Sequence, residues 1–262
     1  MSGAGGPGPG GRSPGVAVVT GAARGIGRAV ADRFAQEGYA VRGLDLEASE
    51  SSPVLEAGKV TLGRCDVSVE EEVAAAIGAV EHQAGAIDVL VNVAGVIVVG
   101  PVEELSYADF RCMVDVNLGG QWLTVKHAVG KMKQRRRGVV VNVASVSGHV
   151  GQVDHVIYGS TKGAVIAFTR ALALELAPFG IRAVSLSPGS VDTEMLRSDV
   201  RSEAARLGRS FEELRAERED EQALRRWADP SEIAGLAFFL ASSEAGFITG
   251  ADVLIDGGWT AR

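Results

Sequence analysis

The chain has 262 residues, which is long enough for one large α/β domain or two small ones with a substantial buried core. Its hydrophobic content of 46% and charged content of 23% are ordinary for a soluble globular protein. The net charge of −7 argues against nucleic acid or an anionic membrane surface as a partner.

Cysteine and histidine usage excludes two further classes of protein. The two cysteines form no CxxC pair and no disulfide framework, and the four histidines show no metal-ligand spacing. We therefore expect no metal site, buried free thiols, and a cytoplasmic location where thiols stay reduced.

The first segment of the chain, residues 1–14, is rich in Gly, Pro and Ser. Such a composition cannot bury enough apolar surface to offset the entropy of ordering, so it predicts a disordered tail. It lacks the apolar stretch of a signal peptide, and no later run is as long as a membrane span. Residues 15–262 are then expected to form a single domain.

After the tail, short apolar runs alternate with helical patterns. The expected strands are Val16–Thr20, Tyr39–Asp45, Lys59–Cys65, Ile87–Val93, Gly138–Ala144, Ile181–Ser187 and Val253–Ile255. The expected helices are Ile26–Glu37, Glu70–Ala84, Tyr107–Lys133 and Tyr158–Ala177. Strands that are apolar on both faces and separated by helices indicate a mostly parallel sheet covered on both sides. The predicted fold class is therefore α/β, a doubly wound Rossmann-type sheet whose ligands bind beyond the carboxyl ends of the strands.

The segment of residues 194–227, called the lid below, interrupts this alternation. It is about half charged and carries apolar residues at helical spacing. It is either a surface helical excursion or a cover over the substrate. We favour the cover, because the segment leaves the sheet at the carboxyl end of a strand.

A glycine-rich loop follows the first expected strand. Gly21 lets the chain turn tightly, while Gly25 and Gly27 let the backbone approach a ligand closely. Unpaired N–H groups at the start of the next helix would face a pyrophosphate. A lone glycine triplet is weak evidence, but Asp45 stands at the end of the second strand, where an acidic residue binds the adenosine ribose.

Asp45 also bears on the choice of cofactor. Its carboxylate accepts hydrogen bonds from ribose hydroxyls and repels a 2′-phosphate, so it favours NAD over NADP. Arg24 points the other way, since its guanidinium could pair with that phosphate. We expect Asp45 to dominate, with Arg24 as its partner or as a solvated loop residue.

Three residues elsewhere suggest proton transfer on an alcohol or carbonyl oxygen. Tyr158 and Lys162 lie one helical turn apart and so share a helix face. A tyrosine can act as a base only if its pKa falls well below about 10, and a nearby ammonium and a cationic nicotinamide ring both favour that fall. Ser145 could donate a hydrogen bond to the developing oxyanion.

These motifs resemble the short-chain dehydrogenase/reductase family over nearly all of the chain from Val16 to Trp259. The TGxxxGxG loop of that family matches Thr20–Gly27, and its PGxVxT stretch matches Pro188–Thr193. Its NNAG segment matches residues 92–95 except for Val93. Its catalytic tetrad matches Asn117, Ser145, Tyr158 and Lys162.

The resemblance implies roles for many further residues. Asp66 and Val67 would contact adenine, Asn117 would hold a water in a proton relay, and Val191 and Thr193 would contact the nicotinamide carboxamide. The whole implied dinucleotide site consists of Gly21, Arg24, Gly25, Ile26, Gly27, Asp45, Asp66, Val67, Asn92, Ala94, Gly95, Tyr158, Lys162, Pro188, Gly189, Val191 and Thr193.

The sequence thus predicts an oxidoreductase that moves a hydride between NAD(H) and a secondary alcohol or ketone, with Tyr158 as general acid/base. The substrate pocket is expected to use the lid together with Ser147, His149, Gln152 and His155. Their polarity favours a small polar hydroxyl or keto compound. Two alternatives stay open, namely an NADP(H)-dependent reductase of 3-oxoacyl thioesters on acyl carrier protein and a non-enzymatic dinucleotide sensor or scaffold.

The two longest expected helices carry apolar or small residues on more than one face. Examples are Val114, Leu118, Ala164, Phe168, Ala171 and Leu172. The surface helix of a monomer needs only one apolar stripe, so the excess predicts a partner subunit. Members of the resembled family pair these two helices across a two-fold axis and add a contact through the C-terminal strand. A homotetramer is therefore expected, with a dimer as the alternative.

Overall fold

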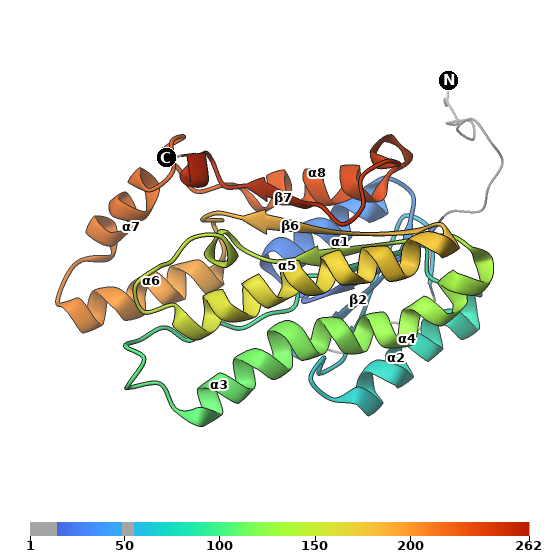
Figure 1. Cartoon of the computed structure of the whole chain (residues 1–262), viewed down its shortest axis with the longest axis horizontal. Coiled ribbons are helices and arrows are strands. Elements are labelled where there is room, and N and C mark those ends of the chain that lie inside the picture. Colours follow the sequence, from blue (N-terminus) through green and yellow to red (C-terminus); the bar gives the residue numbers. More distant parts are fainter. Residues whose placement is uncertain (1–14, 49–54, 262) are drawn as a thin grey trace, which may run out of the picture.

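A computed structural model describes residues 15–48 and 55–261 of the chain. The tail predicted over residues 1–14 lies outside the described residues. The described part contains one continuous sheet with helices on both of its faces (Figure 1).

The sheet has seven strands in the order β3-β2-β1-β4-β5-β6-β7, and every neighbouring pair is parallel. This arrangement confirms the predicted doubly wound α/β fold. The strand bounds are β1 Val16–Thr20, β2 Ala40–Asp45, β3 Val60–Arg64, β4 Val89–Asn92, β5 Gly138–Val143, β6 Ile181–Pro188 and β7 Asp252–Ile255.

The helices form two layers, with α1 and α8 on one face of the sheet and α2, α4 and α5 on the other (Figure 1). Their bounds are α1 Gly25–Gln36, α2 Glu70–Ala84, α3 Tyr107–Val114, α4 Gly120–Arg135, α5 Val156–Leu176, α6 Glu194–Leu207, α7 Phe211–Asp220 and α8 Pro230–Ala241. Sequence analysis assigned no helix to the α8 segment.

The side chains of each strand point alternately to the two faces of the sheet and so contribute to two hydrophobic cores, one on each face. In β1, Ala17 and Val19 pack under α1 and α8, whereas Val16 and Val18 pack under the opposite layer. Successive strand residues point to opposite faces, so a strand in this position must be apolar throughout. All five residues of β1 are buried accordingly.

The strand order reverses between β1 and β4, and one hydroxyl holds this junction together. The Thr20 side chain accepts hydrogen bonds from the backbone N–H groups of Val93 at 3.0 Å and Ala94 at 3.1 Å. The two strand ends are therefore joined at the place where a doubly wound sheet opens a crevice for ligands.

The helix predicted over Tyr107–Lys133 is not α-helical throughout. It consists of α3, a π-helical turn over Asp115–Gly119, and α4. The wider turn places Asn117 inward, where it is fully buried. Such π turns insert one residue without breaking the helix, and side-chain periodicity does not reveal them. The expectation of two buried thiols was wrong for Cys112, which is exposed, whereas Cys65 is buried.

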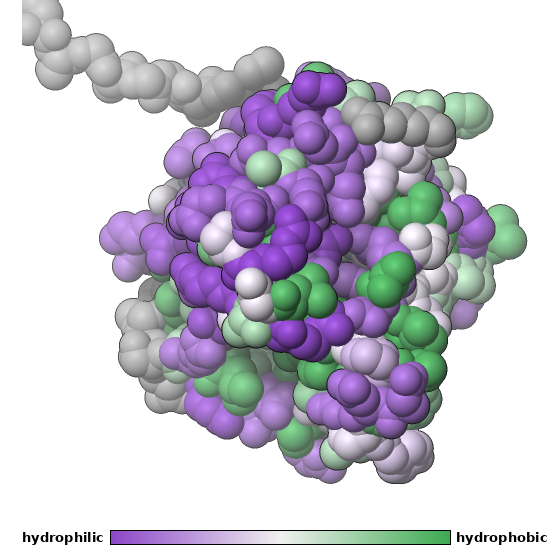
Figure 2. Space-filling model, turned by 90° about the vertical axis from the view of Figure 1, so that its left-hand side faces the viewer, coloured by the Kyte–Doolittle hydropathy of each residue, from purple (hydrophilic) through white to green (hydrophobic). Residues whose placement is uncertain are grey.

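The lid follows β6 and contains α6 and α7, which lie together at one end of the molecule (Figure 1). It has its own small core of Val200, Ala204, Leu214 and Trp227. Figure 2 looks onto this end, where hydrophilic residues cover most of the visible surface and hydrophobic ones form separate patches. The lid is therefore a packed helical unit.

Two searches of the described residues bear on membrane and metal binding. No helix there is both long and apolar enough to cross a lipid bilayer. No group of three or more histidine, cysteine or acidic side chains is placed to hold a metal ion in that same part of the chain.

Candidate active site

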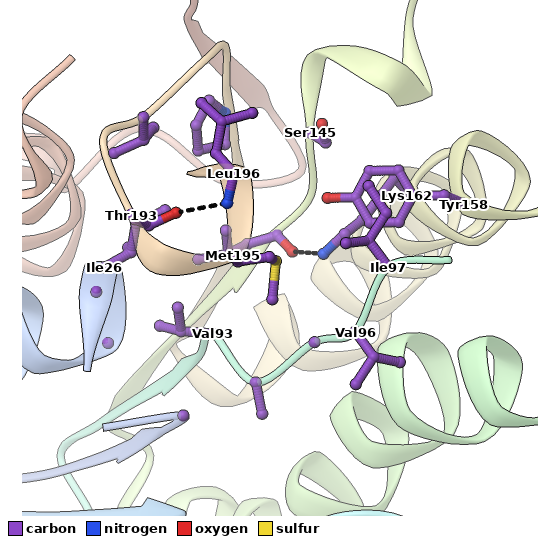
Figure 3. A pocket seen from close by; sticks show the side chains of 18 of the residues that line it. Ile26, Val93, Val96, Ile97, Ser145, Tyr158, Lys162, Thr193, Met195 and Leu196 are labelled. Atoms are coloured by element: carbon purple, nitrogen blue, oxygen red, sulfur yellow. Dashed lines mark hydrogen bonds between the residues drawn. The ribbon is translucent and has the colours of Figure 1, made fainter. Parts of the chain in front are cut away.

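One cavity of about 370 Å³ lies beyond the carboxyl ends of the central strands (Figure 3). The glycine loop after β1 and the segment after β4 form its floor. Residues from β5, α5 and the lid form the opposite wall. The cavity therefore spans the junction between β1 and β4 and continues under the lid.

Backbone geometry explains the three glycines of the loop. Gly21 and Gly25 adopt φ angles of +67° and +55°, which side-chain-bearing residues rarely adopt. At Gly27 a Cβ atom would lie 2.0 Å from the carbonyl oxygen of Gly21. The loop can close on α1 only because that Cβ atom is missing.

The start of α1 is open toward the cavity. Arg24 is the N-cap residue, and its side chain makes no capping hydrogen bond, while Gly25, Ile26 and Gly27 line the cavity. The first N–H groups of a helix lack intrahelical partners and attract anions. This cradle fits the pyrophosphate of a dinucleotide.

Two carboxylates surround the position predicted for the adenosine ribose. Asp45 lines the cavity and accepts hydrogen bonds from the N–H groups of Ala23 and Glu47, each at 2.9 Å. Arg24 pairs with Glu47 at 3.0 Å and not with Asp45, and both partners are more than half exposed. The carboxylate of Asp45 is therefore free of a cationic partner among the described residues.

The adenine end is lined by Asp66 and Val67, but Asn92 has another position. Its side chain is fully buried. It donates to the side-chain amide oxygen of Asn142 at 2.9 Å and accepts from the Thr124 hydroxyl at 2.7 Å. Asn92 thus joins β4 to β5 and α4 below the cavity and does not line it.

Tyr158 and Lys162 meet at the far end of the cavity (Figure 3). The Lys162 ammonium lies 5.6 Å from the centre of the Tyr158 ring and donates to the carbonyl oxygen of Val143 at 3.1 Å. The Tyr158 hydroxyl shares a hydrogen bond with Ser145. The three side chains predicted from spacing therefore surround one point.

Burial dominates the protonation of this pair. It raises the pKa of Tyr158 to about 12, against the lowering effect of the Ser145 hydrogen bond, and the charge of Asp199 raises it further. Burial also lowers the pKa of Lys162 to about 8. The groups of the protein by themselves therefore keep the phenol of Tyr158 neutral.

Asn117 lies behind the cavity wall. Its side chain accepts from the Val96 N–H at 2.8 Å and donates to the Val96 carbonyl at 2.9 Å and to Thr161 at 3.1 Å. Because its polar atoms are engaged in this way, Asn117 holds the segment after β4 against α5.

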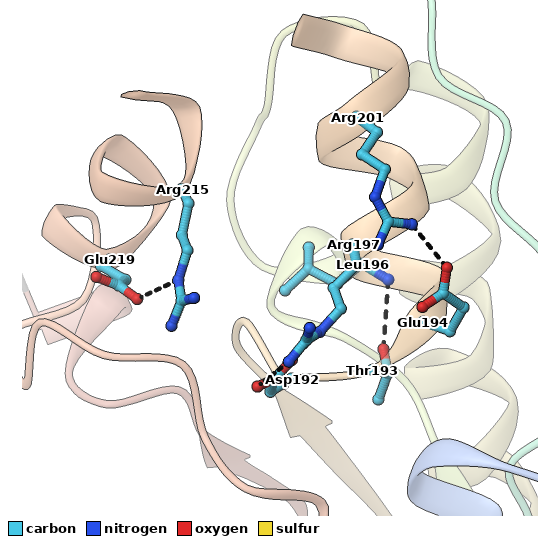
Figure 4. Close-up of polar contacts among 8 residues, drawn as sticks. All are labelled: Asp192, Thr193, Glu194, Leu196, Arg197, Arg201, Arg215 and Glu219. Carbon is cyan, nitrogen blue, oxygen red and sulfur yellow. Dashed lines mark hydrogen bonds and ion pairs between the residues drawn. The ribbon is translucent and has the colours of Figure 1, made fainter. Parts of the chain in front are cut away.

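The stretch after β6 forms the side of the cavity next to the lid. Thr193 touches the glycine loop, since a Cβ atom at Gly25 would lie 3.3 Å from its methyl group. The same side chain caps α6 through the N–H of Leu196, as Figures 3 and 4 show. Asp192 binds Arg197 through both carboxylate oxygens (Figure 4). Pro188, Gly189 and Val191 line the cavity as well.

The substrate end contains three of the four side chains expected there. Ser147, Gln152 and His155 line the cavity. His149 does not, because it pairs with the buried Asp252 at 2.7 Å. The lid lines this end as expected, through residues that sequence reasoning had not named individually: Met195, Leu196, Asp199 and Arg218. Sequence reasoning also missed Val96 and Ile97 among the lining residues, because nothing in their spacing marks them.

Comparisons with known proteins agree with this geometry. Residues 21–260 match a family model described as enoyl-(acyl carrier protein) reductase. The chain is 38% identical to the short-chain reductase protein NovJ of Streptomyces niveus, over 93% of each chain. It is 37% identical to D-threitol dehydrogenase of Mycolicibacterium smegmatis, over 94% of this chain and 93% of that one.

A solved structure of similar shape is a variant of actinorhodin polyketide ketoreductase with NADPH. It superposes with a TM-score of 0.87 at 30% identity, over 95% of this chain and 98% of that chain. The relatives thus include one protein named as a dehydrogenase of a small polyol and one named as a reductase of ketones.

The glycine loop yields a first prediction. In Gly27→Ala the added methyl group meets the Gly21 carbonyl, so we expect a lower melting temperature and loss of dinucleotide binding. Gly78→Ala on α2 is the matched control, because a Cβ there meets no atom within 4 Å. That change should raise stability by about 0.5–1 kcal/mol and leave binding unchanged. Thermal unfolding measures the stability of both variants, and calorimetry measures their dinucleotide binding. Normal dinucleotide binding by Gly27→Ala would contradict this interpretation of the loop.

Proposed function

The chain belongs to the short-chain dehydrogenase/reductase family, and we propose that it transfers a hydride between NAD(H) and a secondary alcohol or the corresponding ketone. One observation carries the proposal. Tyr158, the buried Lys162 and the uncapped start of α1 line the same cavity. The cavity therefore combines a group that can transfer a proton with a site that can bind the phosphates of a dinucleotide.

Each part of the cavity has a task in this reaction. The start of α1 would hold the pyrophosphate, and Asp45 would bind the adenosine ribose. A bound NAD⁺ would supply the hydride acceptor and a positive charge that favours the phenolate of Tyr158. Tyr158 takes the proton of the alcohol, and Ser145 donates a hydrogen bond to its oxygen.

Lys162 has two tasks in the proposal. Its ammonium favours the phenolate of Tyr158, and its unused N–H donors would bind the nicotinamide ribose. Among the described residues Val143 is its one hydrogen-bond partner, although an ammonium has three donors. We assign Asn117 a positioning role, since it fixes the segment that carries Val96.

The alternative is an NADP(H)-dependent reductase of acyl thioesters. The description of the matching family model and the NADPH of the ketoreductase structure favour it. Asp45 and Glu47 argue against it, since both would face the added phosphate and only Glu47 has a cationic partner, the exposed Arg24. A sensor or scaffold would need no ionisable tyrosine in its cavity, and turnover of any alcohol would exclude it.

We further propose that the protein is a homotetramer. On the described surface, α5 exposes 80% of Leu174 and α4 exposes 49% of Trp122, whereas Phe247, close to β7, is fully exposed. Leu172 packs in the core of its own subunit, so it is not available for a partner. Two separate apolar surfaces fit the two contacts of a dihedral tetramer.

Cofactor preference follows from the carboxylate of Asp45. We expect NAD(H) to bind at least about tenfold more tightly than NADP(H), which corresponds to about 1.4 kcal/mol. Asp45→Ala should reduce the difference in affinity between NAD(H) and NADP(H), while Asp32→Ala on the exposed side of α1 should leave that difference unchanged. Calorimetric titration with each cofactor measures it, and NADP(H) binding as tight as that of NAD(H) in the unmodified protein would refute the assignment.

The ionisation of Tyr158 is expected to depend on the oxidised cofactor. In the protein alone the phenol should stay protonated up to a pKa of about 12, whereas NAD⁺ should bring its pKa below about 10. A ligand that lowers a pKa releases protons, so NAD⁺ should bind more tightly as pH rises between those two values.

The phenolate ultraviolet absorbance measures this titration. Tyr158→Phe is the reference, because it keeps Tyr39 and Tyr107 and removes only the tyrosine in question. This variant should bind NAD⁺ with little dependence on pH and should lack turnover. A nearly normal rate in Tyr158→Phe would show that another group carries the proton.

Assembly is measured by light scattering on the purified protein. We expect a mass of four chains of 27.2 kDa each. Leu174→Glu should shift the mass toward dimers or monomers, because it places a charge in an apolar contact. A single-chain mass together with full activity at micromolar concentration would rule the tetramer out.

A further inference from the structure

Asp199 of α6 is an acidic side chain in the wall of the cavity under the lid. In the part of the chain that the structure describes, no hydrogen bond or ion pair reaches its carboxylate. The side chain is half-buried, and burial raises its pKa. A half-buried carboxylate without a partner lacks both the hydration of a surface group and the neutralisation of an ion pair.

The cations around Asp199 are already engaged elsewhere. Arg218 donates to Glu203 at 2.8 Å and to Glu221 at 3.5 Å, and Arg206 pairs with Asp154. The guanidinium of Arg218 is only 15% exposed, and it is held by these two glutamates on the lid itself. Arg218 therefore has its charge partners on the lid itself and forms no ion pair with Asp199.

The adjacent histidine, His155, is held in place through one of its ring nitrogens. The Nδ1 atom of His155 lies 2.7 Å from the carbonyl oxygen of Val153. A carbonyl can only accept, so Nδ1 carries a hydrogen. No hydrogen bond joins His155 to Asp199 among the described residues, so the oxygens of Asp199 remain as hydrogen-bond acceptors in the cavity wall.

The charges at this end do not balance. Four carboxylates, those of Asp154, Asp199, Glu203 and Glu221, stand against the guanidinium groups of Arg206 and Arg218. Anionic substrates would meet like charge here, and like charges at short range in a shielded site cost several kcal/mol. Donor groups that are neutral or positive would instead meet acceptors.

We propose that Asp199 determines substrate specificity by binding a hydrogen-bond donor, a hydroxyl or an ammonium group, close to the carbinol that is oxidised. The preferred substrates are then diols, polyols or amino alcohols, and hydroxy acids and acyl thioesters are disfavoured. The apolar side chains of Val96, Ile97, Met195 and Leu196 line the same end and would contact the carbon skeleton. This inference rests on the proposed function for its statement about turnover.

A set of ring compounds that differ in one substituent tests the proposal. The reference probe is cyclohexanol. The other probes are the 1,2 and 1,3 isomers of cyclohexanediol, aminocyclohexanol and hydroxycyclohexanecarboxylate. Calorimetry measures their binding to the protein–NADH complex, and NADH absorbance measures their oxidation. At least one diol or amino alcohol should exceed cyclohexanol by about tenfold in affinity and in kcat/KM, and every carboxylate should fall below cyclohexanol.

Asp199→Asn should remove this preference. The diol and amino alcohol should lose about tenfold, the amino alcohol more because it also loses a charge partner, and cyclohexanol should be unaffected. The hydroxycyclohexanecarboxylates should bind more tightly and be oxidised faster. Asp220→Asn is the matched control, since it removes the same charge from the lid at a side chain that is 71% exposed. Asp220→Asn should leave the affinity and the kcat/KM of every probe unchanged.

The possible outcomes separate this inference from the proposed function. Oxidation of alcohols without any preference that depends on Asp199 overturns the inference and leaves the function standing. Binding that depends on Asp199, but without turnover of any alcohol, refutes the proposed function and supports the binding site. Tighter binding of the carboxylates than of the diols overturns the inference in either case.

Discussion

A buried ammonium is the constraint on which this site depends. Lys162 is 3% exposed and has one protein hydrogen-bond partner among the described residues, the carbonyl of Val143 at the end of β5. Removing a charge from water without a counter-ion is expensive, which explains why its pKa falls to about 8. Only a rigid frame tolerates such a group. The frame consists of the end of β5, the inner face of α5, and Gly95, where a Cβ atom would lie 3.6 Å from the ammonium nitrogen.

The same burial acts in the opposite sense on Tyr158. Its phenol is neutral in the protein alone, because desolvation and the nearby Asp199 both disfavour the phenolate. A base of this kind becomes active only when further positive charge enters the cavity, which in our proposal comes from the oxidised cofactor. The order of binding then follows from electrostatics, since the cofactor must be present before the tyrosine can accept a proton.

The two halves of the cavity differ in how they are built. The dinucleotide half is made from turns that directly follow β1, β2 and β4, so short-range backbone geometry shapes it. The substrate half is made from the lid and from the segment before α5, which are joined by long-range contacts such as that of Arg206 with Asp154. Thr193 belongs to both halves, because it touches the glycine loop and caps α6. One side chain therefore lies between the glycine loop and the lid.

Sequence alone determined the parallel α/β fold, the glycine loop, and the meeting of Tyr158 with Lys162. Each of these depends on local rules, namely apolar runs buried on both faces, a strand–turn–helix geometry, and a spacing of four residues on a helix. Other features could be decided only by the tertiary structure. It engages Asn92 and Asn117 in hydrogen bonds within the protein, pairs His149 with Asp252, joins Arg24 to Glu47, and brings the charge of Asp199 near enough to raise the pKa of Tyr158. Spacing along the chain cannot reveal these contacts, because they depend on which face of each element packs against a segment that is distant in sequence.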